Sequence, residues 1–322
     1  MDLIYTNAAR EDLGVLHDYN FDLAFGSDEN DFELTVNCYN NCIKPSSLVY
    51  IEGTEYGGIV DGLKVVTKDE KLVYTGRTWH GILEKKILSP DEGSDHLTVS
   101  GEANTVIASL LERIGLTALF SASAEDSGLT ISNYSMERYV PAYTGIKKML
   151  ATVSGKLKFE LKDGMVIISA LPAVDYSKDE QFDNDQVEME IAKSFNYVNH
   201  LICLGSGELA ERQIVNLYVD AEGNISENQT FYGLDELVET YDYGNAQSIE
   251  ELTEKGKEKL ASYTSGGSVK MDFAAESTIY SIGDIVGAKE TITGTFVKEK
   301  ITKKIVTINK GETNIEYEVG EL

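Results

Sequence analysis

The sequence predicts a β-rich α+β protein built from several domains. Its 322 residues exceed the usual length of one domain about twofold. Segments in which polar and apolar side chains alternate recur near both ends of the chain, whereas helical spacing of apolar residues is found between them. Hydrophobic residues make up 42% of the chain, which excludes a wholly disordered protein.

The segment 1–90 is predicted to form an N-terminal β domain. Asp18 to Phe25 alternates polar and apolar side chains, and Phe32 to Tyr39 resumes the alternation after a polar turn. Three further strands are expected, at Leu48–Ile51, Gly58–Lys68 and Lys71–Leu83. The polar residues 67–70 form a hairpin loop between the last two of these strands, and none of the five segments has the length or spacing of a long helix.

The segment 91–172 is predicted to form a small α/β domain. From Glu102 to Ile114 the apolar side chains form a helical stripe, and Gly115 stands where a C-terminal cap belongs. A second helix is expected from Tyr143 to Val153. A β-hairpin follows, with strands at Lys156–Leu161 and Met165–Ala170.

The segment 173–275 is predicted to combine strands with a helix in an acidic domain. Strands are expected at Tyr197–Leu204 and Gln213–Val219. Ser248 and Glu251 form a capping box, which opens an apolar helical stripe that ends before Gly266 and Gly267. Residues 171–260 hold 20 acidic and 6 basic residues, so the negative charge of the chain is concentrated here.

The segment 276–322 is predicted to contain strands only. They are expected at Thr278–Tyr280, Thr291–Lys300, Lys303–Ile308 and Asn314–Val319. Residues 281–322 hold 7 acidic and 6 basic residues. This near-neutral balance is typical of a segment that packs against other protein surfaces.

The net charge of −26, from 28 basic and 54 acidic residues, restricts the function classes. Sequence-independent binding to nucleic acid needs a basic face, and binding to an anionic membrane surface needs one as well. Both are disfavoured. The first residues lack the basic and apolar regions of a secretory signal, and no apolar run reaches the roughly 18 residues of a membrane helix.

The motifs that could carry chemistry are weak. Gly205 to Ala210 fits a dinucleotide-binding pattern, but a new strand is expected at Gln213, which leaves no room for the helix that such a site needs. The three cysteines are expected to be free thiols, and no zinc ligand set is present. A catalytic triad assembled from one of the four histidines in space stays open. No catalytic residue, cofactor or metal ligand is predicted.

Two residues of the segment from Tyr74 to Leu83 are candidates for an interface or for packing, namely Arg77 and Trp79. Trp79 is the lone tryptophan, and its expected strand lies between turns. We expect the indole to anchor the core, while stacking on a sugar or on a partner stays open as the alternative.

Four segments resemble, as a set, the tail and baseplate hub proteins of bacteriophages and prophages of Gram-positive bacteria. They are Phe21–Leu34, Tyr74–Leu83, Asn199–Leu209 and Ile282–Ala288 with the closing strands. These proteins are similar to the hub of contractile tails. The resemblance implies two barrel-like β domains in each subunit, completed by the last strands of the chain, with smaller α/β domains outside a trimeric ring.

The resemblance also implies partners and a location. The partners would be two further copies of the chain, the tail tube or distal tail protein, the tape-measure protein, and other baseplate or tip proteins. The location would be the tail of a virion or of a phage-tail-like particle, assembled in the cytoplasm of the bacterial host. Neither a membrane nor sequence-specific nucleic-acid binding is expected.

The sequence therefore predicts a structural hub that is not an enzyme. Longer relatives carry a C-terminal peptidase or glycan hydrolase domain, for which no room is expected here because Leu322 follows a strand closely. Two alternatives stay open: a tail-tip enzyme that degrades the cell wall, such as a peptidoglycan hydrolase or endopeptidase, and a cell-surface binding module.

Overall fold

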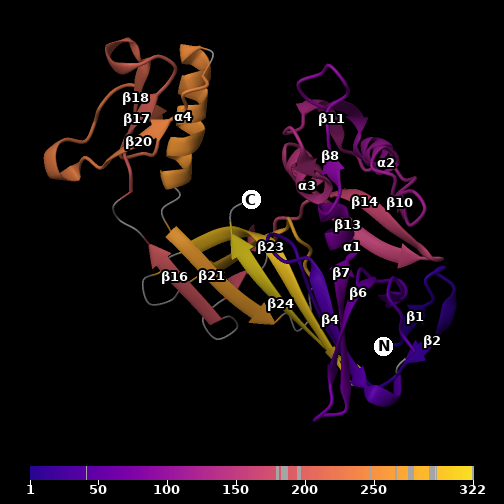
Figure 1. The fold of residues 1–322 in the computed structure, drawn as a ribbon. Coiled ribbons are helices and arrows are strands. Elements are labelled where there is room, and N and C mark those ends of the chain that lie inside the picture. The colour runs from indigo at the N-terminus through magenta and orange to yellow at the C-terminus, as the bar shows by residue number, and fades with distance from the viewer. Residues whose placement is uncertain are drawn as a thin grey trace. The chain divides into compact units, whose positions relative to one another are not determined.

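The computed structural model describes residues 1–40, 42–178, 181–182, 188–193, 197–246, 248–264, 267–274, 279–289, 294 and 296–320. The chain divides into two compact units (Figure 1). Unit 1 comprises Met1–Met189 and Lys270–Leu322, and unit 2 comprises Glu190–Val269. The β-rich α+β class is confirmed, whereas the division into four domains at 90/91, 172/173 and 275/276 stays a prediction.

One large sheet contains thirteen of the described strands. Its main path runs through β16 (Glu188–Lys193), β21 (Gly267–Ala274), β24 (Glu312–Gly320), β23 (Phe296–Asn309), β3 (Tyr19–Phe25), β4 (Asp31–Asn37), β7 (Lys71–Thr78), β6 (Gly57–Val66), β5 (Leu48–Tyr50), β1 (Leu3–Thr6) and β2 (Asp12–Leu16). Beside this path, β15 (Gln181–Phe182) pairs with β22 (Ile285–Lys289), which pairs with β23. The short 3-10 helices η1 (Cys38–Asn40) and η2 (Tyr176–Lys178) lie in the connections.

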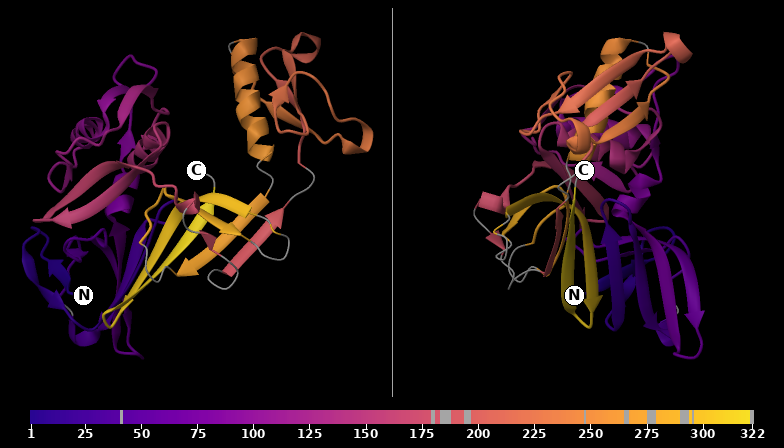
Figure 2. Two further views of the ribbon diagram at one scale, coloured as in Figure 1. Left: turned by 180° about the vertical axis from the view of Figure 1, so that it is seen from behind. Right: turned by 90° about the vertical axis from the view of Figure 1, so that its left-hand side faces the viewer.

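The end of the chain is built into the same sheet as its beginning. β23 pairs along β24, and it also pairs with β22 through its first residues and with β3 through residues 304–309. The right-hand view of Figure 2 shows these yellow strands beside the N-terminal ones. Gly26 permits the approach, because a Cβ built on it would lie 2.2 Å from the carbonyl oxygen of Thr302.

The expected break in this strand is absent. We expected separate strands at Thr291–Lys300 and Lys303–Ile308, but β23 is continuous, and a register shift against β24 between Ile301 and Lys303 absorbs the irregularity. Residues 291–293 and 295 lie outside the described residues, as does Thr278 of the expected strand Thr278–Tyr280. Ile279 and Tyr280 are not in a strand.

The core of the large sheet lies on its concave side. Leu3 of β1, Phe21 of β3 and Val306 of β23 belong to one cluster of fully buried side chains, although β1 stands far from β3 and β23 in the sheet order. The Tyr19 hydroxyl donates to the carbonyl oxygen of Met1 at 2.8 Å. The sheet therefore curls around its core. Among the described ladders, none joins β1 or β2 to β23 or β24.

An α/β layer packs on this sheet within unit 1. Its elements are α1 (Trp79–Glu84), β8 (Ile87–Leu88), β9 (Thr98–Glu102), α2 (Ala103–Arg113), β10 (Phe120–Ala122), β11 (Thr130–Ser135), β12 (Val140–Pro141), α3 (Ala142–Ala151), β13 (Gly155–Lys162) and β14 (Met165–Pro172). Both long helices and the β13–β14 hairpin are confirmed. Gly115 has a φ of 68°, and its N–H donates to the carbonyl oxygen of Glu112, as expected of a helix end.

The strand expected over Lys71–Leu83 is wrong at its C-terminal end. β7 ends at Thr78, and the next residues form the short helix α1. The Thr78 hydroxyl oxygen accepts the backbone N–H of Gly81 at 3.3 Å, so a threonine N-cap begins the helix. The apolar run that we interpreted as a strand is buried because α1 lies between the sheet and the α/β layer.

Unit 2 is a small sheet with one long helix. Its elements are β17 (His200–Leu204), η3 (Leu209–Glu211), β18 (Ile214–Val219), β19 (Ile225–Ser226), η4 (Gly233–Asp235), β20 (Val238–Asp242) and α4 (Ile249–Thr264). The strand order is β19-β18-β17-β20, and β20 runs parallel to β17. The capping box is confirmed, because the Ser248 hydroxyl oxygen accepts the N–H of Glu251 at 3.1 Å. Gly266 lies outside the described residues.

Candidate functional site

Arg77 lies on the outer, solvent-facing side of the large sheet. Its guanidinium makes a two-pronged ion pair with Asp61, with Nε–Oδ2 and Nη2–Oδ1 distances of 2.7 and 2.8 Å. These hydrogen bonds hold the pKa of the Asp61 carboxyl below its ordinary value. Asp61 lies where the register of β6 against β7 shifts, so the ion pair with Arg77 stabilises a β-bulge in β6.

The surface around Arg77 is an acidic depression across five strands. It is lined by Asp22, Leu23, Ala24, Asp31, Phe32, Glu33, Asp61, Thr75, Gly76, Arg77 and Ile305. The four carboxylates against one guanidinium make this face suited to contacting a protein and unsuited to binding phosphate.

Trp79 is the first residue of α1 and is 0% exposed. It belongs to a core cluster that extends from Leu48 and Tyr50 of the sheet region to the helices of the α/β layer. A Cβ built on Gly57 would lie 2.6 Å from Cζ2 of the indole, so the backbone of β6 rests directly against the ring. Stacking on a sugar would require this core to open.

His80 lies beside Trp79 at the joint between the sheet and the α/β layer. Its ring stacks on Phe25 at a centroid distance of 4.4 Å and touches Phe159 at 4.1 Å. Burial lowers the pKa of His80 well below its ordinary value, and the ammonium groups of Lys147 and Lys304 lower it further. The imidazole is therefore neutral, and it lines a cavity of about 70 Å³.

Two buried ion pairs connect the end of the chain to the rest of unit 1. Lys304 of β23 is 2% exposed, and its Nζ lies 2.6 Å from Oε1 of Glu55. Burial alone would lower the pKa of Lys304, but the combined interactions with the Glu55 carboxylate, Tyr56 and Tyr317 outweigh burial and raise the pKa. Asp284 accepts from the Nζ of Lys156 at 2.7 and 2.8 Å and from the backbone N–H of Val174 at 2.8 Å.

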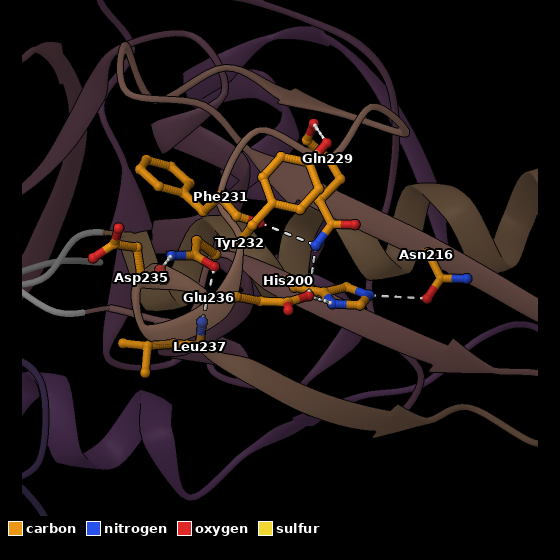
Figure 3. Close-up of polar contacts among 9 residues, drawn as sticks. His200, Asn216, Gln229, Phe231, Tyr232, Asp235, Glu236 and Leu237 are labelled. Atoms are coloured by element: carbon orange, nitrogen blue, oxygen red, sulfur yellow. Dashed lines mark hydrogen bonds and ion pairs between the residues drawn. The ribbon is translucent and has the colours of Figure 1, made fainter.

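A polar network centred on His200 lies in unit 2, and the sequence analysis missed it (Figure 3). Nδ1 of His200 lies 2.7 Å from Oε1 of Glu236, and Nε2 lies 2.9 Å from Oδ1 of Asn216. Both partner atoms, a carboxylate oxygen and an amide oxygen, are hydrogen-bond acceptors. The Nε2 of Gln229 also donates to Glu236, at 2.8 Å.

The network fixes the loop between β19 and β20. Asn199 extends it, because its Nδ2 donates to the carbonyl oxygen of Asp235 at 2.7 Å and its Oδ1 accepts the N–H of Leu237 at 3.0 Å. The ring of His200 also stacks on Tyr218 at 4.3 Å. These partners are separated by up to 38 residues in sequence, and no local motif marks them.

The glycine motif and the segment from Asp220 to Asn224 are turns. Gly205 to Ala210 connects the antiparallel strands β17 and β18, and η3 is the 3-10 helix between them, so the expected new strand directly after the motif is confirmed. Asp220 accepts the backbone N–H groups of Glu222 and Asn224 and closes a turn. Within the described residues, no three histidine, cysteine or acidic side chains converge as metal ligands. None of the described helices is long and apolar enough to cross a membrane.

Three solved structures are similar to this chain over nearly its whole length. The 43 kDa tail protein of prophage MuSo2 from Shewanella oneidensis has a TM-score of 0.60 and 12% identity, with coverage of 100% of this chain and 98% of that one. The tail protein from Neisseria meningitidis MC58 has a TM-score of 0.56 and 12% identity, with 99% and 96% coverage. Prophage tail protein gp18 from Listeria monocytogenes EGD-e has a TM-score of 0.56 and 11% identity, with 99% and 94% coverage.

No protein-family model and no curated protein sequence matches the chain. At 11–12% identity the likeness concerns the fold, and this chain has the fold of phage and prophage tail proteins. The resemblance drawn from the sequence is confirmed to that extent. The three similar structures come from three different bacteria, so a Gram-positive host stays a prediction.

Proposed function

We propose that this protein is a structural hub or adapter at the tip of a phage tail or phage-tail-like particle, where it joins the tail tube to the baseplate or tip. The observation that carries the proposal is the likeness of the entire chain, in both units, to prophage tail proteins. The likeness covers 99% or more of this chain in all three comparisons, so it involves the whole architecture rather than one common module.

The proposed assembly is a ring of three copies. The outer edge of β2 is free of described strands, and its Leu13 and Val15 side chains are 53% and 39% exposed. An exposed apolar edge strand invites pairing with another chain, and a closed ring of subunits would remove it. The curl of the large sheet supports the proposal of barrel-like domains within each copy, to which the last strands of the chain contribute through the pairing of β23 with β3.

A ring of this kind would offer DNA and the tape-measure protein a channel that does not hold phosphate. The net charge of −26 makes a basic lining hard to assemble. A negative lining would repel a passing phosphate backbone, whereas lysines and arginines would bind it through counterion release.

The proposal is tested by mass and by location. Sedimentation of the purified protein is expected to show a trimer, or a ring that forms with the tail tube protein. Immunogold labelling of purified particles is expected to mark one end of the tail. A protein that stays monomeric in solution and is absent from purified particles would refute the hub assignment.

We propose further that the protein has no hydrolase activity of its own. The described polar contacts of His96 and His200 are made with a carbonyl oxygen, a carboxylate and an amide, and His80 is enclosed by aromatic rings. Purified cell wall incubated with the protein is expected to stay intact. Reproducible cleavage that one histidine or serine substitution abolishes would favour a tail-tip enzyme instead.

A further inference from the structure

Among the residues that the structure describes in unit 2, the long helix α4 packs on one face of the sheet and no other long helix packs on the opposite face. Leu201 and Cys203 of β17 point to the face where Leu252 and Leu260 of α4 pack. Because side chains alternate along a strand, His200, Ile202 and Leu204 point to the opposite face. Figure 1 shows α4 along one side of β17, β18 and β20. We call the other side the helix-free face.

The helix-free face presents exposed apolar side chains beside a few polar ones. In the sheet register Leu204 stands beside Ile214, and His200 stands beside Val238. Ile214 is 56% exposed and Val238 is 48% exposed, while Ile202 and Leu204 are half-buried. Water therefore contacts a strip of branched aliphatic side chains that runs from Ile214 through Leu204 and Ile202 to Val238. The polar residues Asn216, Thr240 and Asp242 border this strip. Such a strip on a folded protein marks a surface that another molecule covers.

The loop between β19 and β20 extends this strip at the His200 end. Glu236 contacts His200, which places the loop at that end of the face (Figure 3). The loop exposes Tyr232 and Leu234, and Leu234 is as exposed as in an extended peptide, at 101%. In a surface loop that no other molecule contacts, large apolar side chains are expected to be buried or to be replaced by polar ones. The hydrogen bonds of Glu236 and Asn199 instead hold this loop in an open conformation.

The charge around the face is almost entirely negative. Residues 197–246, which include the four strands and the loop, hold nine acidic residues and one basic residue. The basic residue, Arg212, is already paired with Asp242 at 2.5 Å. The lysines of α4 lie on the element that covers the opposite face.

This charge selects among the possible occupants. A second copy of unit 2 would place like charges against each other, which costs several kcal/mol at an interface. A nucleic acid, an anionic cell-wall polymer or an anionic membrane would be repelled in the same way. A protein surface with an apolar centre and a basic rim matches both the strip and its surroundings.

We infer that the helix-free face of unit 2 docks a protein in which lysine or arginine side chains surround an apolar patch. The inference rests on the proposed function, because the partner would be another component of the tail. The hydrogen-bond network of His200 positions the loop that borders the docking surface.

The test uses the full chain in assembled particles. A photo-activated cross-linking amino acid is introduced at Ile214 and, in a second variant, at Val238. A control variant carries it at Leu63, which is similarly exposed at 52% but lies on β6 of unit 1. After irradiation of purified particles, the cross-linked peptides are identified by mass spectrometry. We expect positions 214 and 238 to join a different protein through a segment with net positive charge, and position 63 to leave that segment unlinked.

Charge reversal provides a second readout. Asp242 on β20, which stands beside Leu204 on the helix-free face, and Glu92 in unit 1 are both exposed acidic residues. In the chain with the cross-linker at Ile214, Asp242→Lys is expected to lower the yield of the cross-link roughly fivefold or more, and Glu92→Lys to leave it unchanged.

The outcomes separate the inference from the function on which it rests. One set of outcomes is that the particles contain the chain, but positions 214 and 238 link to a second copy, to a neutral or acidic segment, or to nothing. Each of those results overturns the inference and leaves the hub assignment intact. Absence of the chain from purified particles overturns the hub assignment, and the inference with it.

Discussion

Replacement of Trp79 by alanine is expected to destabilise unit 1 strongly. The indole is fully buried, and the backbone of β6 at Gly57 touches it, so the surrounding structure has little freedom to collapse into the space left behind. Truncation of a buried tryptophan costs about 3–5 kcal/mol through lost burial and the residual cavity. In a unit of this size each kcal/mol of lost unfolding free energy lowers the melting temperature by roughly 2–4 °C, so we expect the melting temperature of the variant to decrease by roughly 6–20 °C.

The measurement is calorimetry combined with urea unfolding followed by circular dichroism, because the variant contains no tryptophan. The matched control is Tyr232→Ala, which removes a side chain that is 65% exposed and should change stability by about 0.5 kcal/mol or less. Trp79→Phe should recover part of the loss. A melting temperature of Trp79→Ala equal to that of the wild type would refute the packing role, and lost particle assembly at unchanged stability would place Trp79 on an interface.

Three further perturbations test the structure. Lys304→Met should lower the free energy of unfolding, measured by urea titration, by roughly 3 kcal/mol, because it leaves Glu55 without its partner. The double variant with Glu55→Gln should regain part of this stability. A urea midpoint of Lys304→Met equal to that of the wild type would contradict the buried ion pair. Burial raises the pKa of Glu102, but hydrogen bonds from Ser127, Asn104 and Thr105 together outweigh burial and lower the pKa to about 2. The ionised carboxylate therefore stabilises the folded state at any pH above the pKa that Glu102 has in the unfolded chain, and this stabilisation is lost as the pH falls toward 2. Glu102→Gln should therefore flatten the acid limb of a stability-versus-pH curve, and an unchanged limb would count against this cap. Burial raises the pKa of Cys203 to about 11, so native protein at pH 8 should alkylate there far more slowly than urea-unfolded protein, and equal rates by mass spectrometry would place the thiol in solvent.

Elements whose signals are local were predicted well. The helix α2 was recognised from its apolar stripe and Gly115, and the helix α4 from the capping box at Ser248. The β13–β14 hairpin was recognised from two alternating segments around a short turn. Each of these signals lies within a few residues of the element that it marks, so no tertiary information was needed.

Elements that depend on distant partners were missed or bounded wrongly. β20 pairs in parallel with β17, so no hairpin turn joins the two strands and marks β20 in the sequence. The helix α1 consists of residues that are equally suited to a buried strand, and only its place between two layers decides the outcome. The network of His200 joins residues of β17, β18 and the loop before β20, and none of them carries a recognisable motif.

The amino-acid sequence alone indicated the β-rich α+β class, the acidic character of the chain, and the local helices and hairpins, because composition and short-range periodicity are sufficient to recognise them. It also contained four segments that together resemble phage tail proteins. The tertiary structure was needed to show that β23 pairs with β3, across more than 270 residues, that Trp79 is enclosed by two layers, and that α4 packs on one face of the described sheet of unit 2. The physical reason is that a strand pattern specifies which side chains are buried but not which edge the backbone will pair with, and that choice is made by packing over the whole chain.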